Sequence, residues 1–109
     1  MKNKSKRAKA LSKIKHHNFA GNKYRIKWEK PVDVYGEHGG VEINGLCEEP
    51  SIYGRKITID PDLPDKELLK TAIDEAIHGC IFALDNDFVD KMSESIGELI
   101  WRMGYRSTH

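Results

Sequence analysis

The fold is decided by residues 66–84, which read KELLKTAIDEAIHGCIFAL. Apolar residues spaced three and four apart predict a helix over this range, and they cover most of its circumference. The narrow polar stripe that remains holds Thr71, Asp74, Glu75 and His78. A helix that is apolar on nearly every side is normally buried, and buried carboxylates are costly unless they are paired or bind a metal ion. The stripe therefore predicts a functional site.

Residues 74–78 of this helix read DEAIH, which is one residue away from the H-E-x-x-H pattern of zinc hydrolases. Asp74 and His78 are four residues apart, so they lie on one helix face and can converge on a single ion. Carboxylate oxygen can bind zinc, and oxygen-rich ligation also suits manganese or another hard divalent ion. We therefore expect Asp74 and His78 to be metal ligands and Glu75 to activate a water molecule. The alternative is a helix surface with ordinary polar contacts.

A second helix is predicted from about Phe88 to Met103, after a turn at residues 84–87. One of its sides carries Ser93, Glu94, Gly97 and Trp101. The two small residues indicate that another helix approaches this side closely, so Glu94 would face the first helix. We expect Glu94 to be the third metal ligand, and Glu98 is the competing candidate.

Residues 68–80, LLKTAIDEAIHGC, resemble the metal-binding helix of small SprT-like or minimal-gluzincin metallopeptidase domains, many of them encoded by bacteriophages. Residues 88–96 resemble the second helix of these zincin-like domains, with Glu94 in the ligand position. The chain departs from the family at Asp74, where a metal-binding His is usual. The resemblance implies a zinc-dependent peptidase with Glu75 as the catalytic residue. It also implies that a strand beside the cleft binds the extended substrate, and we expect residues 55–60 to be that strand.

The first half of the chain predicts strands. Polar and apolar residues alternate over residues 23–29, 41–43 and 55–60, whereas residues 32–35 lead into a glycine-rich turn at 36–40. Three strands followed by two helices predict an α+β fold, with a short three-stranded antiparallel sheet packed on two helices. We expect residues 23–109 to form a single zincin-like domain.

Charge is distributed unevenly along the chain. Residues 1–28 hold ten Lys or Arg and no Asp or Glu, whereas the remainder holds eight Lys or Arg and seventeen acids. Residues 1–22 are therefore predicted to be a basic, flexible arm. Such an arm could contact nucleic-acid phosphates through residues 2–27, or could fold back on the acidic body as a solubilising tail.

Length and composition limit the remaining possibilities. At 109 residues the chain forms one domain, and no run approaches the roughly 18 apolar residues of a membrane span. We expect a monomer located in the cytoplasm, which would be the host cytoplasm for a phage-encoded protein. Cys47 and Cys80 are expected to be free thiols, since disulfides are rare in that compartment.

Two functions follow from these observations. The first is a metal-dependent peptidase that uses zinc, or manganese or another divalent ion, and acts on a peptide or protein. The alternative is a catalytically inactive zincin-like binding module that engages a host protein or nucleic acid through its cleft and basic arm. A third possibility is that the acidic body mimics DNA, but the basic arm opposes it.

Overall fold

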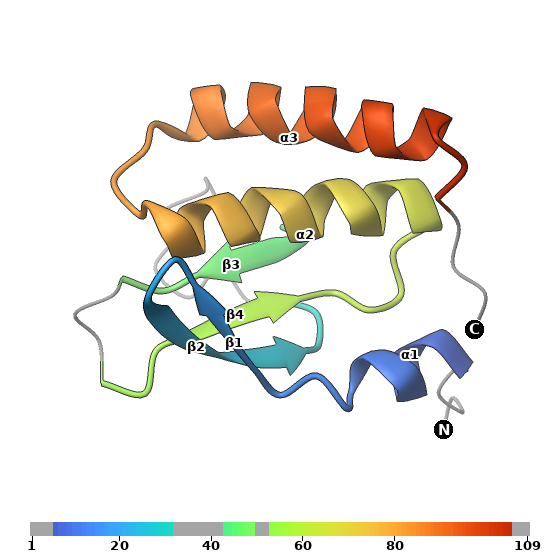
Figure 1. Ribbon diagram of the computed structural model, residues 1–109. Coiled ribbons are helices and arrows are strands. Elements are labelled where there is room, and N and C mark those ends of the chain that lie inside the picture. The colour runs from blue at the N-terminus through green and yellow to red at the C-terminus, as the bar shows by residue number, and fades with distance from the viewer. Residues whose placement is uncertain (1–5, 32–42, 50–52, 106–109) are drawn as a thin grey trace.

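A computed structural model describes residues 6–31, 43–49 and 53–105. In chain order its elements are α1 (Lys6–Leu11), β1 (His16–Phe19), β2 (Asn22–Trp28), β3 (Gly45–Cys47), β4 (Lys56–Ile59), α2 (Asp65–Cys80) and α3 (Asn86–Arg102). The strands form one sheet, α2 covers a face of it, and α3 lies on α2 on the side away from the sheet (Figure 1). The α+β class and the two packed C-terminal helices are therefore as the sequence predicts.

The sheet has four strands in the order β1-β2-β4-β3, and it is mixed rather than antiparallel. β1 pairs with β2, and β3 with β4, in antiparallel fashion, whereas the two central strands are parallel. The prediction of three antiparallel strands was wrong in this respect. The chain returns from the end of β2 to the start of β4 through residues 29–55, and this long connection allows the two strands to run in the same direction.

β1 is the strand that the sequence analysis did not expect. Ala20 and Gly21 both have positive φ angles, of 53° and 93°, which is the backbone of a tight two-residue hairpin turn. The Asn18 side chain accepts a hydrogen bond from the Gly21 amide at 2.7 Å. Phe19, at the end of β1, packs against Gly79 of α2, where an added Cβ would lie 2.9 Å from the Phe19 ring.

The N-terminal segment is further held by Arg7 of α1. Its guanidinium donates hydrogen bonds to the carbonyl oxygens of Pro61 and Leu63, the former at 2.8 Å, and it forms an ion pair with Asp65 at the start of α2. Ala8 is buried beside it. The structure thus differs from the expected arm at residues 6–22, because this segment buries apolar side chains and satisfies backbone carbonyls of the body. Residues 1–5 lie outside the described part.

The core lies between the sheet and α2. Its buried side chains are Tyr24, Ile57, Ile59, Leu63 and Leu68. Alternation along β2 and β4 places Tyr24, Ile57 and Ile59 on the face toward α2, whereas Lys23, Arg25 and Lys27 of β2 are exposed. The expected strand at 41–43 and the turn at 36–40 fall wholly or largely outside the described residues.

α2 and α3 form an antiparallel helical hairpin. α2 ends at Cys80, earlier than the predicted Leu84, because Ile81 leaves the helical conformation with φ −140°. Asp85 is the N-cap of α3, and its Oδ2 accepts a hydrogen bond from the Phe88 amide at 3.1 Å. The short turn between the helices keeps them side by side. No described helix is long and apolar enough to cross a membrane, and Cys47 and Cys80 are free thiols.

Candidate functional site

A cleft of about 560 Å³ lies between β3 and the facing sides of α2 and α3. Residues 43–47 form one wall. Thr71, Asp74, Glu75 and His78 line it from α2, and Asn86, Asp90, Ser93 and Glu94 line it from α3. The polar stripe of the first helix therefore faces a cleft.

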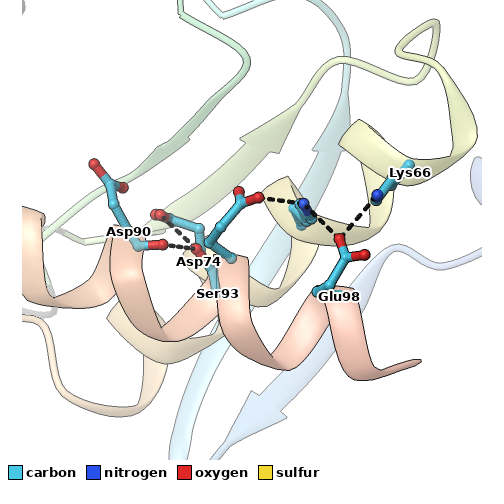
Figure 2. Close-up of polar contacts among 7 residues, drawn as sticks. Lys66, Asp74, Asp90, Ser93 and Glu98 are labelled. Atoms are coloured by element: carbon cyan, nitrogen blue, oxygen red, sulfur yellow. Dashed lines mark hydrogen bonds and ion pairs between the residues drawn. The ribbon is translucent and has the colours of Figure 1, made fainter. Parts of the chain in front are cut away.

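Asp74 is at the centre of the polar contacts in this cleft. Its Oδ2 accepts a hydrogen bond from the Ser93 hydroxyl at 3.3 Å (Figure 2). Its Oδ1 lies 3.7 Å from Nε2 of His78. The carboxylate of Asp90 lies near enough to act on Asp74 electrostatically. Burial and the neighbouring Asp90 raise the pKa of Asp74 to about 7, although the Ser93 hydroxyl opposes the shift. The Asp74 carboxyl group can therefore gain or lose a proton near neutral pH.

Glu75 is the most deeply buried acid of the cleft, with 7% of its surface exposed. No hydrogen bond or ion pair joins its side chain to another residue in the described ranges. Burial, followed by the negative charges of Asp74 and Asp90, raises the pKa of Glu75 to about 8. This carboxyl group is therefore poised to gain or lose a proton close to neutral pH.

His78 is also buried, with 8% exposure. Burial lowers the pKa of its imidazole, and hydrogen bonds to the Phe82 backbone and the Asn86 side chain act against this shift. The ring faces Asp74, whose Oδ1 lies 3.7 Å from Nε2 of His78. A neutral imidazole that is oriented through one nitrogen can use the other as a metal ligand or a base.

Glu94, the expected third ligand, lines the cleft but is paired with a cation. The ammonium group of Lys70 forms an ion pair with its carboxylate, and 68% of the Glu94 side chain is exposed. Lys70 also contacts Glu98 at 3.4 Å, and Lys66 contacts Glu98 at 2.8 Å (Figure 2). The α3 carboxyl group that interacts with Asp74 is instead that of Asp90.

The sequence analysis missed Asp90, although the chain carries a signal for it. Because α2 and α3 are antiparallel, residues earlier in α2 lie opposite residues later in α3. Asp74 meets Ser93, and Lys70 meets Gly97, where an added Cβ would lie 2.5 Å from Lys70 Cγ. One turn nearer the connecting turn, the residue opposite His78 is therefore Asp90 rather than Glu94.

Whether these residues suit a metal ion depends on the donor set and its spacing. As placed, no three His, Cys, Asp or Glu side chains in the described ranges stand close enough to hold an ion. The chemistry of the donors is nevertheless suitable, since Asp74, His78 and Asp90 offer two carboxylates and a neutral imidazole to one cleft.

Comparison of the chain with protein families, with curated proteins and with solved structures found no match. The class of protein is therefore inferred from the fold and the cleft themselves.

Proposed function

We propose that this protein is a metal-dependent hydrolase of the peptidase type, with Asp74 and His78 as metal ligands. The observation that carries the proposal is the gathering of three acids in one cleft, of which Glu75 is buried, Asp74 is half-buried and Asp90 is exposed. Asp74, Glu75 and Asp90 interact unfavourably with one another, and no Lys or Arg in the described ranges pairs with them. A divalent cation would compensate these charges, and the third ligand that the contacts favour is Asp90 rather than Glu94.

A bound zinc or manganese ion would polarise a substrate carbonyl and lower the pKa of a water molecule. The chain's own residues supply the rest of the chemistry. Glu75 is the proposed base, because its buried carboxyl group exchanges a proton near neutral pH. Ser93 orients Asp74 through its hydroxyl. β3 and the two helices form the walls of the cleft.

The proposed substrate is an extended peptide that pairs with β3. β3 lies at the edge of the described sheet and its residues line the cleft. The strand at 55–60, which the sequence analysis assigned to this role, corresponds to β4 and is flanked on both sides by β2 and β3. Only an edge strand offers unpaired backbone groups to a peptide, so β3 replaces β4 in the proposal.

Metal binding by two matched variants tests the ligand set. Elemental analysis and titration calorimetry with zinc and manganese are carried out on the intact chain, on Asp90→Ala and on Glu94→Ala. We expect about one equivalent of metal in the intact chain, its loss in Asp90→Ala and its retention in Glu94→Ala. Retention of the metal in Asp90→Ala and its loss in Glu94→Ala would instead identify Glu94 as the third ligand. Absence of metal from all three proteins would contradict the proposed centre.

Hydrolysis is tested separately with Glu75→Gln, which keeps the shape of the side chain and removes its charge. The variant should bind metal and remain folded but lose activity against a mixture of unstructured peptides. Unchanged activity would show that Glu75 is not the base. An intact chain that binds metal but cleaves no peptide would favour the inactive binding module.

A second candidate function is contact with nucleic acid, which the outer face of the sheet favours. Lys23, Arg25 and Lys27 of β2 are exposed on the face away from α2, and Lys56 of β4 is paired with Arg25 in the parallel register. Tyr53, which is fully exposed, is next to Gly54, whose carbonyl accepts a hydrogen bond from Arg25 at 3.2 Å. Basic side chains beside an exposed ring suit phosphates and stacked bases.

The salt dependence of DNA binding tests this second candidate. The double variant Lys23→Glu/Lys27→Glu should lower the affinity for single-stranded DNA and flatten its dependence on salt. Lys91→Glu, an exposed charge reversal on α3, is the matched control. Equal binding by the two variants, or no binding by the intact chain, would contradict a role for this face.

A further inference from the structure

Lys70 is the only Lys or Arg among the described residues that line the cleft. The aliphatic part of its side chain crosses Gly97 of α3, where an added Cβ would lie 2.5 Å from Lys70 Cγ. The ammonium group beyond this contact forms an ion pair with Glu94 and lies 3.4 Å from the carboxylate of Glu98. Packing against α3 thus holds one positive charge at the end of the cleft that is nearest the start of α2.

The charges around this ammonium group are balanced by an exposed side chain. Glu98 is shared, because it lies 2.8 Å from the ammonium group of Lys66 and 3.4 Å from that of Lys70 (Figure 2). Glu94 lines the cleft and is the more exposed of the two acids, 68% against 45%. An exposed ion pair is weak, so the carboxylate of Glu94 can turn into solvent. A carboxylate of a ligand could then take its place on Lys70 without changing the balance of charge.

The directions of the elements place the C-terminus of a bound peptide at this end of the cleft. β3 is antiparallel to β4 and runs in the same direction as α2 (Figure 1). Antiparallel pairing is the more stable arrangement, so a peptide added to the edge of β3 would run from the His78 end of the cleft toward Lys70. Lys70 precedes Asp74 by one helical turn, about 6 Å, and an extended residue spans about 3.4 Å. A carboxylate one or two residues beyond a peptide bond held at Asp74 therefore reaches the ammonium group.

We propose that Lys70 binds the C-terminal carboxylate of the substrate, so that the peptidase removes one or two residues from the end of a peptide. This role of Lys70 rests on the proposed function, because it takes hydrolysis at Asp74 and His78 as given. In that reaction the C–N bond breaks, the oxygen of water enters the new carboxyl group, and the proton that Glu75 accepts from water passes to the leaving amine. Glu94 occupies the place of the substrate carboxylate in the free protein.

Peptide binding by the metal-free protein tests Lys70 without hydrolysis. The probes are N-acetyl-tri-alanine and its C-terminal amide, titrated in the presence of a chelator and followed by NMR chemical shifts. The intact chain should bind the free acid at least about tenfold more tightly than the amide. Lys70→Met keeps the aliphatic contact with Gly97 and should lose this preference. Equal affinities for the two probes, no binding of either by the intact chain, or a preference that persists in Lys70→Met would overturn the proposal.

Glu94→Gln gives a result that a purely structural role of the ion pair would not produce. The substitution removes the carboxylate that competes for Lys70, so the affinity for the free acid should rise by about threefold while that for the amide stays the same. Lys66→Met is the matched control, because Lys66 is a neighbouring cation of α2 that is not among the described cleft-lining residues. It should change neither affinity by more than about twofold. An unchanged or lower affinity of Glu94→Gln for the free acid would contradict the competition.

The cleavage products separate the role of Lys70 from the proposed function. With metal supplied, the intact chain should shorten N-acetylated peptides from the C-terminal end and leave their amides intact, as mass spectrometry of the products would show. Cleavage of acids and amides alike at internal bonds would support the hydrolase and overturn the role of Lys70. A carboxylate preference that depends on Lys70, without metal binding or cleavage, would support carboxylate binding and contradict the proposed hydrolase.

Discussion

Gly45 of β3 lies directly against the carboxylate of Glu75 on α2. A Cβ added at Gly45 would stand 2.6 Å from Oε2 of Glu75 and 2.8 Å from Cγ2 of Thr71. The absence of a side chain at this point lets the edge strand close over the deepest acid of the cleft. The burial of Glu75, and therefore its raised pKa, depends on this close approach.

Gly45→Ala should destabilise the protein by about 1–3 kcal/mol, because the added methyl group overlaps Glu75 and Thr71. Urea unfolding followed by circular dichroism measures the change. Combining Gly45→Ala with Glu75→Ala removes one of the overlapping groups, so part of the loss should be recovered. Strict additivity of the two substitutions would show that the contact is absent in solution.

The pKa of Glu75, raised by burial from 4.5 to about 8, makes stability depend on pH in a defined direction. Between these values the folded protein holds a proton that the unfolded chain has lost. The free energy of unfolding should therefore fall as the pH rises from about 5 to 8, with a slope from Glu75 of at most about 1.4 kcal/mol per pH unit. The raised pKa of Asp74, about 7, adds to the fall over the lower part of this range.

Glu75→Gln should flatten this pH dependence and make the protein more stable than the intact chain at pH 8 but not at pH 5. Urea unfolding in the presence of a chelator measures the difference. Glu67→Gln, an exposed position of the same helix, is the control. A pH profile of Glu75→Gln that matches that of Glu67→Gln would contradict the burial of Glu75 as an acid.

Asp74→His should raise the affinity for zinc by at least about tenfold, because it introduces a second imidazole one helical turn from His78. Competition with a chromophoric chelator measures the change. The same substitution at the exposed Asp87 should have no such effect. If neither the intact chain nor Asp74→His binds zinc, His78 does not face a metal site.

Arg7→Ala should destabilise the protein by about 2–3 kcal/mol, since it removes charged hydrogen bonds to Pro61 and Leu63 and the ion pair with Asp65. Lys9→Ala, exposed on the same short helix, should change stability by less than about 0.5 kcal/mol. If the two substitutions change stability equally, Arg7 does not hold the N-terminal segment on the body, and the flexible arm expected from sequence would be supported.

The sequence alone predicts the elements whose patterns are local. The periodicity of residues 66–84 and 88–103 locates both C-terminal helices, and alternation locates β2 and β4 to within one or two residues. The clustering of Asp74, Glu75 and His78 on one side of a helix is likewise local, because it follows from 3.6 residues per turn. The tendency of Ser93 and Gly97 to face another helix is also readable in the sequence.

Only the tertiary structure determines how these elements meet. Charge made residues 1–22 resemble an unfolded arm, but Phe19 against Gly79 and Arg7 against Asp65 place residues 6–22 in the body. β2 pairs in parallel with β4, which follows it at a distance in the chain. The alignment of α2 with α3 likewise places Asp90 opposite His78. Strand pairing and helix alignment depend on which packing of the whole chain buries the most apolar area with the fewest unpaired charges. No single segment contains that information.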